Sequence, residues 1–372
     1  MRILRNYILK EIAGPLIGSL AVFTFVLLVG NIFKLADLMI NKGVDIIDVI
    51  RLFLYLIPYI LSYTIPMAIL TATMVCFGRL ASDNEVTAMK ASGISLYRIG
   101  LPVVVLAFLI SLASVYLNDR ILPASHFASY RLVKSVALKN PSAYLEPGIF
   151  IKTFKGYIVR IDKIEGKNLE GILIYQLQDK GPTRTVIAES GEFITHLNKG
   201  VITLRLSNGS VDEPNPQDPS IFYKLNFKTY DMTLDLDKDI SLDDIKKVKP
   251  KSMTIKELKE NIAKLRVSGG SSEHIRKEIN ERLTEIHRKI AMAFSSFVFV
   301  LVALPLAINT KKREKSVGFA MSLIILTLYY LILFGGMALS LRGMVPAIFG
   351  VWMANLIYFI TGIILTSIVI EQ

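Results

Sequence analysis

Six long apolar runs constrain the fold of this chain more than any other feature of its 372 residues. A helix needs about 20 mostly apolar residues to cross the hydrocarbon core of a membrane. Runs long enough to do so cover Gly14–Phe33, Leu52–Gly78, Leu101–Leu117, Ile290–Ile308, Val317–Leu341 and Val345–Ile370. The sequence therefore predicts an α-helical integral membrane protein with six transmembrane helices.

The short loops between these runs differ in charge. Lys and Arg gather in the N-terminal segment, in the loop after the second run and in the loop after the fourth, which contains NTKKREK. The loops on the other side carry few cations, such as Lys42 and Arg342. Because cytoplasmic loops are enriched in Lys and Arg, both termini are predicted to be cytoplasmic. The net charge of +12 is then explained by these cytoplasmic loops and does not indicate nucleic-acid binding, since no basic stripe is interleaved with stacking aromatics.

A long polar segment between the third and fourth runs indicates a separate domain on the outer side. The predicted organisation is residues 1–118 with three transmembrane helices, residues 119–288 as the outer domain with helical connectors, and residues 289–372 with the last three helices. Within the outer segment, β-like stretches follow one another, among them GYIVRIDKI, LEGILIYQLQ, PTRTVIAES, GEFITHL and GVITLRLSNGS. Several strands without intervening helices predict an all-β sandwich, jelly roll or barrel.

Turn and cap signals subdivide the outer segment. LNKG, between GEFITHL and VITLRLS, predicts a hairpin, and SNGS predicts a further turn. Alternation in VITLRLS places Leu204 and Leu206 on one face of a strand and Arg205 on the other. SMTIKELKEN predicts a helix that opens with a Ser or Thr cap, and the charged helix that follows is expected to run into the fourth span.

The sequence contains no constellation of residues for catalysis. It lacks the GxxxxGK[ST] loop that binds nucleotide phosphates, the HExxH zinc motif and the GxSxG nucleophile motif. Its single cysteine, Cys76, excludes an intrachain disulfide and a cysteine metal cluster. No Asp or Glu falls inside the six runs, so a buried carboxylate relay has no support. We therefore expect a transport or binding protein with no cofactor of its own, and not an enzyme.

A short polar stretch, RLASDNEVTAMKASGISLYRIG, separates the second and third spans on the predicted cytoplasmic side. Two interpretations are open. Ser82 and Glu85 form an S-x-x-E pattern, which predicts a capping box that satisfies backbone N–H groups at the start of a helix. The second interpretation is a helix that docks into a soluble partner, with Val86, Met89 and Leu80 as the residues that could fill a groove and Glu85 paired with a basic residue there.

The segment ASDNEVTAMKASGIS resembles the cytoplasmic coupling helix of the lipopolysaccharide-export permeases, the LptF/LptG family, in which a Glu is followed by MxASGxS. The resemblance also covers RNYILKEI at the N-terminus, the prolines of the second span, the outer β insert, the basic loop after LPLAI, and WMANLIY in the sixth span. VIAESGEFITHLNKG resembles the LptF branch more than the LptG branch. The resemblance implies a coupling helix at about residues 80–92 that contacts an ATPase subunit through Glu85, Val86, Met89, Ala91 and Gly93.

The same resemblance implies a set of partners. The chain would pair with a paralogous six-span permease subunit as a heterodimer, and a separate dimeric cytoplasmic ATPase would drive it. The outer domain would be a periplasmic β-jellyroll that passes lipopolysaccharide to a β-jellyroll bridge protein. The expected location is the inner membrane of a Gram-negative-type bacterium. The alternative function is that of a non-transporting membrane protein whose outer domain binds a partner or transmits a signal.

Lipopolysaccharide combines several acyl chains with anionic phosphates, so a protein that extracts it needs cations near the outer rim of an apolar cavity. The candidates are Lys34 near the outward end of the first span, and Lys42 and Arg342 in outward loops. Lys34 has an alternative role as the i,i+3 partner of Asp37, with its side chain reaching the membrane interface. Lys42 and Arg342 have an alternative role as interfacial anchors.

Overall fold

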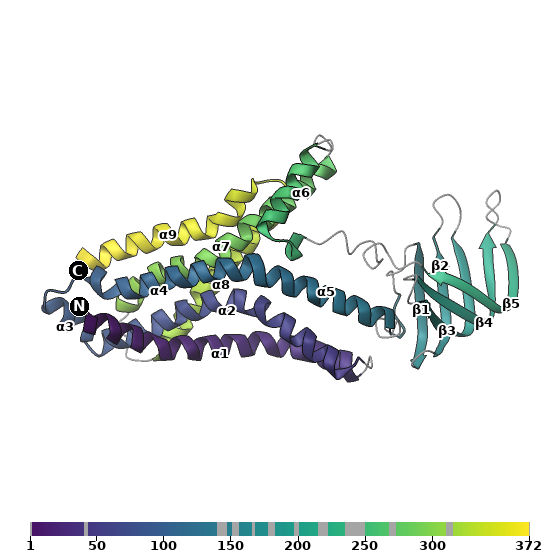
Figure 1. The fold of residues 1–372 in the computed structure, drawn as a ribbon, viewed down its shortest axis with the longest axis horizontal. Helices are drawn as coiled ribbons and strands as arrows, with labels where there is room; N and C mark the ends of the chain where they lie inside the picture. The colour runs from purple at the N-terminus through teal and green to yellow at the C-terminus, as the bar shows by residue number, and fades with distance from the viewer. Residues whose placement is uncertain are drawn as a thin grey trace. The chain divides into compact units, whose positions relative to one another are not determined.

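The structure is a computed structural model that describes residues 2–40, 44–139, 147–150, 156–165, 168–177, 183–196, 201–214, 222–234, 250–267, 273–309 and 315–371. Helices lie towards both ends of the chain and strands lie in its middle (Figure 1). Contacts group the residues into two units. The helical unit comprises Met1–Asn31, Tyr55–His126 and Lys249–Gln372, and the other unit comprises Ile32–Leu54 and Phe127–Val248.

The helices follow the predicted spans but are longer. They are α1 (Arg2–Ile40), α2 (Ile46–Ser82), α3 (Glu85–Ala91), α4 (Leu96–Tyr116), α5 (Leu122–Lys139), α6 (Ile255–Val267), α7 (Glu273–Asn309), α8 (Lys315–Leu341) and α9 (Ala347–Glu371). A π-helical turn, Leu117–Ile121, joins α4 to α5, and a 3-10 turn, Pro250–Ser252, precedes α6.

Six helical segments are long and apolar enough to cross a membrane, which confirms the six predicted transmembrane helices. They are Arg2–Ile40, Ile46–Ser82, Leu96–Val133, Glu273–Asn309, Val317–Leu341 and Ala347–Val369. The helices run past the apolar runs because the flanking residues also favour helix. The first half of α7, for example, is rich in Glu, Arg and Lys and contains neither Gly nor Pro, which are the residues that disfavour a helix.

α7 is the central helix of the helical unit, where it packs against α4, α8 and α9. In its most apolar window 72% of the residues are buried, including Phe299 and Val300. The corresponding share is 11% for α1 and 28% for α8, although both are as apolar as α7. Apolar faces this exposed on α1 and α8 are suited to contact lipid or another membrane helix.

Two glycines set the spacing between α8 and α9. A Cβ atom on Gly336 would collide with the carbonyl oxygen of Gly350, and a Cβ on Gly350 would collide with the carbonyl oxygen of Gly336. The two backbones therefore touch directly at this crossing. Small residues at such contacts let helices associate by close packing in a membrane, where the hydrophobic effect between them is absent.

Polar side chains join the helices inside the apolar core. The Tyr329 hydroxyl of α8 donates to Asn355 Oδ1 of α9 at 2.7 Å, and Asn355 Nδ2 donates to the Ala291 carbonyl of α7 at 2.9 Å. On the other side, Thr71 Oγ1 of α2 donates to Ser322 Oγ of α8 at 2.9 Å. Each group would be costly to leave unpaired away from water, so these bonds favour one arrangement of the helices.

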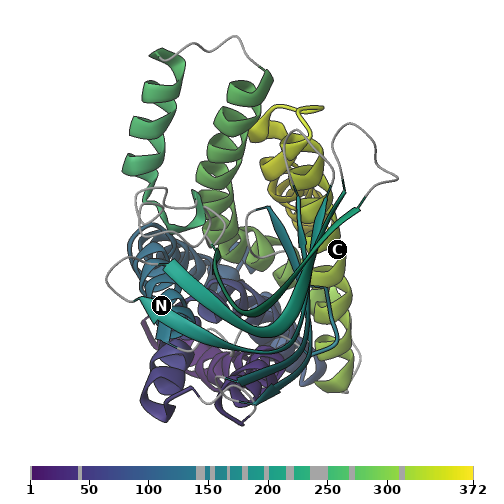
Figure 2. The same cartoon turned by 90° about the vertical axis from the view of Figure 1, so that its right-hand side faces the viewer.

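The inserted segment forms one antiparallel sheet of five described strands in the order β1-β2-β3-β4-β5. They are β1 (Tyr157–Glu165), β2 (Asn168–Gln176), β3 (Arg184–His196), β4 (Val201–Pro214) and β5 (Phe222–Leu234), and Figure 2 shows the sheet to be curved. The predicted inserted all-β domain is confirmed. Each described strand pairs with its neighbours in the chain, as in a meander, whereas a jelly roll also brings non-consecutive strands together.

The faces of the sheet differ as the alternation predicts. Leu204 and Leu206 are fully buried, together with apolar residues from the other four strands, while Arg205 is exposed. Arg205 donates to Asp231 at 2.9 Å across β4 and β5, and this guanidinium holds the pKa of Asp231 below its usual range. The hairpin prediction is supported by His196 pairing with Val201, although LNKG itself, residues 197–200, lies outside the described residues.

Two glycines explain where the predicted strand boundaries are wrong. PTRTVIAES and GEFITHL are one strand, β3, and SNGS is not a turn but part of β4. A Cβ on Gly191 would meet the Arg205 carbonyl oxygen at 2.9 Å, and one on Gly209 would collide with the Ile187 carbonyl oxygen. These glycines permit close approach of neighbouring backbones inside a strand, which the sequence pattern cannot distinguish from a turn.

Each of the five strands contains one residue that is left out of the regular pairing, and these five residues lie side by side in a row across the sheet. The register between neighbouring strands passes over Asp162, Gly171, Glu189, Asn208 and Lys228. Gly171 and Asn208 in this row have positive φ, at 65° and 53°. Such local departures from ideal pairing bend a sheet, and they fit the curvature seen in Figure 2.

Candidate functional site

The polar stretch after α2 forms a short helix, but the predicted capping box is wrong. Ser82 is the last residue of α2, and its hydroxyl donates back to the Arg79 carbonyl at 2.9 Å. The N-cap of α3 is Asn84, which has a left-handed backbone (φ 59°) and makes no side-chain cap bond. With α2 and α3 only two residues apart, Ser82 cannot take the extended conformation that a capping side chain needs.

The C-terminal end of α3 is closed by its own backbone. The Gly93 N–H donates to the Lys90 carbonyl at 2.9 Å, and the Ile94 N–H donates to the Met89 carbonyl at 3.0 Å. Gly93 has φ of +81°, a conformation that glycine adopts without strain. This is the Schellman pattern, and Met89 and Ile94 pack against the core as its apolar pair. The SGI sequence at 92–94 therefore has a structural role.

The N-terminal helix holds α3 from the side. The Tyr7 hydroxyl of α1 donates to Glu85 Oε2 at 2.7 Å, although the two residues are 78 positions apart. One turn further along α1, Glu11 Oε2 pairs with the Arg79 guanidinium of α2 at 2.6 Å. Both bonds are partly exposed, so each contributes only modestly, but together they join α1 to both sides of the α2–α3 turn.

The five residues predicted to contact an ATPase do not share one face of α3. Val86 is buried, with 3% of its surface exposed, and belongs to the core of this chain, so it cannot fill a partner's groove here. Glu85 and Met89 are half-buried. The exposed face consists of small residues and one cation: Thr87, Ala88, Lys90, Ala91, Ser92 and Gly93.

Arg342, in the loop between α8 and α9, lies beside a cationic cleft of about 560 Å³. Arg276 and Lys277 of α7 also line it, and its one lining carboxylate, Glu273, pairs with Lys277 at 2.8 Å. The cleft therefore carries more positive than negative charge. Lys34 belongs to α1, but its side chain is outside the described residues, as is all of Lys42.

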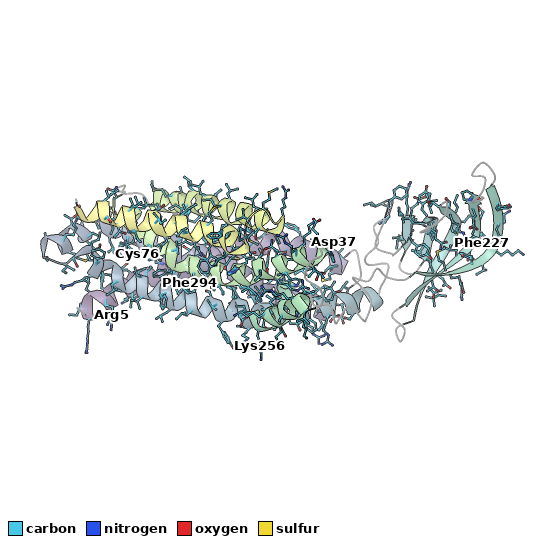
Figure 3. The ribbon with its side chains drawn as sticks, turned by 90° about the horizontal axis from the view of Figure 1, so that it is seen from above. Arg5, Asp37, Cys76, Phe227, Lys256 and Phe294 are labelled. Carbon is cyan, nitrogen blue, oxygen red and sulfur yellow. The ribbon has the colours of Figure 1, made fainter. Side chains whose placement is uncertain are left out.

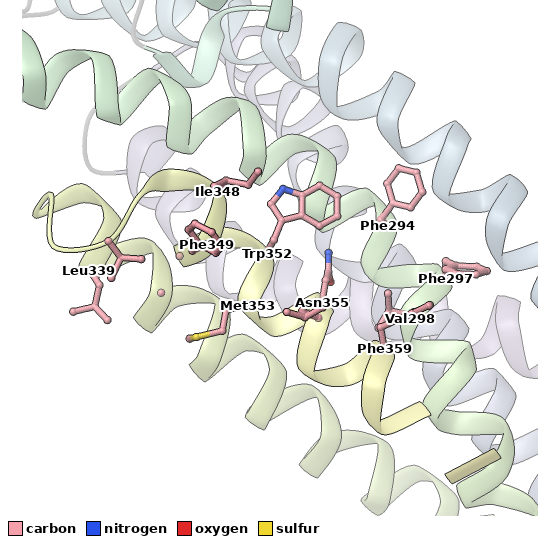
Figure 4. A pocket seen from close by; sticks show the side chains of 14 residues that line it. Phe294, Phe297, Val298, Leu339, Ile348, Phe349, Trp352, Met353, Asn355 and Phe359 are labelled. Atoms are coloured by element: carbon pink, nitrogen blue, oxygen red, sulfur yellow. The ribbon is translucent and has the colours of Figure 1, made fainter. Parts of the chain in front are cut away.

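An apolar pocket of about 570 Å³ adjoins this cleft, because Val345 lines both. Its walls come from α7, α8 and α9, and Figure 4 shows the Phe294 ring beside the Trp352 indole, with Ile348, Phe349 and Met353 further along. The Trp352 Nε1–H donates to His287 Nδ1 at 3.4 Å. Cations at one end and aromatic and aliphatic side chains at the other match the two ends of an anionic lipid.

Residues 6–367 match the protein family described as lipopolysaccharide export system permease LptF/LptG. The chain belongs to this family. It is 20% identical to the lipopolysaccharide export system permease protein LptF of Escherichia coli (strain K12) over 369 residues, which covers 98% of this chain and 94% of that protein. It is 27% identical to protein RP871 of Rickettsia prowazekii over 221 residues, which covers 57% of this chain and 61% of that protein.

Family membership makes this LptF/LptG permease an inner-membrane protein of a lipopolysaccharide export system, and so not itself an enzyme. The resemblance to the LptF/LptG family that was stated from the sequence is thereby confirmed. In this permease, α3 is the segment that carries that resemblance, and its geometry is set by α1 and by its own glycine.

Several functional candidates in this permease were missed from sequence. Tyr7 and Glu11 lie in RNYILKEI, where polar and apolar residues are mixed, and nothing local to them points to Glu85 and Arg79. Arg276 and Lys277 lie in the first half of α7, where charged residues are frequent, so neither stands out. Their signal is spacing, since Glu273, Arg276, Lys277 and Asn280 recur at the i, i+3, i+4, i+7 interval of one helix face.

The permease also buries an ion pair just before the fourth apolar run. Arg288 donates to both carboxylate oxygens of Glu285, at 2.6 and 2.8 Å, and both side chains are more than nine-tenths buried. The neighbouring Lys289 ammonium donates to the Met253 carbonyl, and Asp119 Oδ1 accepts from the Ile255 N–H at 2.6 Å. The Lys289 bond attaches the segment between the 3-10 turn and α6 to α7, and the Asp119 bond attaches the start of α6 to the π-helical turn. These charged groups therefore have structural partners.

Proposed function

We propose that this permease is one half of a heterodimer with a paralogous six-span subunit, and that a separate dimeric cytoplasmic ATPase docks on α3 and drives extraction of lipopolysaccharide. Both termini and α3 are cytoplasmic in this proposal, and the sheet is periplasmic, as the loop charges favour. The permease itself holds no cofactor. The sheet passes the lipid to a β-jellyroll bridge protein, for which β5, the last strand in the order of the described strands, suits strand addition.

The single observation that carries this proposal is the way in which α3 is held. A helix of seven residues is too short to be stable alone, yet α3 is fixed by buried Val86, by the Schellman end and by the Tyr7–Glu85 bond. Its other face is left exposed and lined with small residues, which permits close approach of a partner. A short, rigid, exposed helix is a suitable element to receive force from a second protein.

Glu85 is the residue by which docking is tested. One oxygen accepts from Tyr7, and we propose that the half-exposed carboxylate also pairs with a basic residue of the ATPase. Glu85→Lys should weaken association with the ATPase by about 2–5 kcal/mol, because the partner's charge is left unpaired. Copurification of the ATPase and export of lipopolysaccharide from proteoliposomes measure this.

The matched control is Asp83→Lys, which makes the same charge change at an exposed position two residues away. It should leave copurification almost unchanged. A charge reversal at the partner's basic residue should partly restore association with Glu85→Lys. Full complex yield and normal export with Glu85→Lys would contradict the proposal.

We further propose that the cleft beside Arg342 receives a phosphate of the transported lipid, with acyl chains in the adjoining pocket. The double variant Arg276→Gln/Arg342→Gln should lower the affinity of the complex for lipopolysaccharide by about fivefold per cation lost. The control Lys256→Gln/Lys259→Gln removes the same charge from exposed positions of α6. Equal affinity for lipopolysaccharide in both variants would remove Arg342 from the lipid path.

A further inference from the structure

A second amphipathic cleft lies at the opposite end of the helical unit from Arg342, where α1 and α4 begin. It has a volume of about 610 Å³ and is lined by the first turns of both helices. Three of its lining residues are arginines, Arg2 and Arg5 of α1 and Arg98 of α4, and none of its lining residues is acidic. The proposed functions above leave this cleft without a role.

The arginines of this cleft keep most of their charge available. All three side chains are exposed, and Figure 3 shows Arg5 extending outward from the end of α1. The Arg5 guanidinium lies 3.4 Å from the neutral Asn6 amide oxygen, which does not neutralise it. Three cations without a lining carboxylate repel one another, and an anion between them relieves that repulsion.

Both walls of the cleft have the same polarity along their helix. On α1, Arg2, Arg5 and Leu9 are spaced i, i+3, i+7, and on α4, Arg98, Leu101 and Val105 have the same spacing. Each set forms one helical stripe in which the cations come first and the apolar residues follow. Leu9 and Val105 lie about 10 Å along the axis from the first arginine of their stripe, at about 1.5 Å per residue. The cleft thus has a cationic rim and an apolar interior.

We infer that this cleft binds an anionic glycerophospholipid of the bilayer leaflet at this end of the protein. The phosphate sits among Arg2, Arg5 and Arg98, and an acyl chain lies along Leu9, Leu101 and Val105. Guanidinium groups bind phosphate oxygens through two parallel N–H···O bonds, and basic pockets between transmembrane helices are typical sites for anionic headgroups. A soluble phosphate would use the rim but would leave the apolar interior empty.

The position of the cleft connects this lipid to α3. One wall is the helix that carries Tyr7, the partner of Glu85, and the other contains Ile94, the last residue of the Schellman pattern. A lipid bound to both walls would restrain the two elements that hold α3. This inference does not depend on the docking of an ATPase, because binding to the permease alone is sufficient to test it.

The test is native mass spectrometry of the purified full-length permease in detergent, titrated with dioleoylphosphatidylglycerol and, separately, with dioleoylphosphatidylcholine. The triple variant Arg2→Gln/Arg5→Gln/Arg98→Gln should lose at least about tenfold in affinity for the anionic lipid and change little for the zwitterionic one. The control Lys10→Gln/Lys256→Gln/Lys259→Gln removes three exposed cations that do not line the cleft, and should retain nearly full affinity.

A second variant tests the apolar interior without removing charge. Val105→Trp should fill the space below the arginines and lower affinity for the lipid, while inorganic phosphate at millimolar concentration should fail to displace the lipid from the native chain. Circular dichroism of each variant checks that the helices are intact. Unchanged phosphatidylglycerol affinity in the triple variant, an equal loss in the lysine control, or displacement by inorganic phosphate would each overturn the inference.

Discussion

Two four-residue segments of this permease carry the same cap pattern and form different structures. In TIKE, at 254–257, the Thr254 N–H donates to Glu257 Oε2 at 2.7 Å, and the Glu257 N–H donates to Thr254 Oγ1 at 3.3 Å. This is the reciprocal capping box that the pattern predicts, and α6 begins at the next residue. In SDNE, at 82–85, neither reciprocal bond is present.

The difference comes from what surrounds each segment. Thr254 follows a 3-10 turn, so its backbone is free to adopt the cap conformation. Ser82 is still within α2, and the carboxylate of Glu85 is taken by the Tyr7 hydroxyl from α1. A local pattern therefore decides the structure only where its residues have no better partner. α6 is started by its own sequence, whereas α3 is positioned by the rest of the molecule.

The largest effect on the position of α3 is expected at Val86, because this residue attaches α3 to the core through its buried side chain. Val86→Asp places a charge among apolar side chains and should cost several kcal/mol, enough to detach α3. Hydrogen exchange of the amides of residues 85–94 should then rise by orders of magnitude. Thr87→Asp adds the same charge at an exposed neighbour and should leave exchange close to that of the native chain. Equal exchange in both variants would mean that burial does not position α3.

A smaller effect is expected at Tyr7, which tests the tertiary bond directly. Tyr7→Phe removes only the hydroxyl that donates to Glu85, and should weaken the attachment of α3 by about 1–2 kcal/mol, since the bond is partly exposed. Amide exchange in α3 should rise by roughly five- to thirtyfold, and exchange in α6 should not change. Native exchange rates in α3 of Tyr7→Phe would show that the bond contributes nothing.

The smallest effects separate the two caps themselves. Thr254→Ala removes a cap side chain and should destabilise the first turn of α6 by about 1 kcal/mol. Ser82→Ala removes a hydroxyl that bonds within α2 and should be nearly silent, within about 0.5 kcal/mol. Exchange of the first amides of α6 and α3 measures both. A comparable loss of stability in the two variants would show that Ser82 does cap α3, contrary to the structure.

The same distinction explains how much was predictable from sequence. The six spans, the all-β insert and the strand face of Leu204 and Leu206 depend on local apolar periodicity, and all are confirmed. The continuous strand through Gly191 depends on the carbonyl of Arg205 on the neighbouring strand, so the sequence alone could not reveal it.

The candidate site was less predictable than the fold, for the same reason. ASDNEVTAMKASGIS contains α3, but the helix predicted at about residues 80–92 starts too early, because residues 80–82 belong to α2. The glycine in the segment has the positive φ that its C-terminal position requires. Which side of α3 is buried depends on α1 and on the core, so Val86 was assigned to the wrong surface. The meeting of Arg342 with Arg276 depends on the packing of α8 and α9 against α7, which no local pattern encodes.

The contact between Gly336 and Gly350 has a consequence for how the permease responds to its bilayer. α8 has 27 residues and α9 has 25, or about 40 and 37 Å at about 1.5 Å per residue. Both exceed a hydrocarbon thickness of about 30 Å, and tilting is one way in which such helices fit the bilayer. Because their backbones touch at the two glycines, lipid cannot enter there and neither helix can tilt without the other. A change in bilayer thickness that tilts one of these two helices is therefore expected to tilt the other with it.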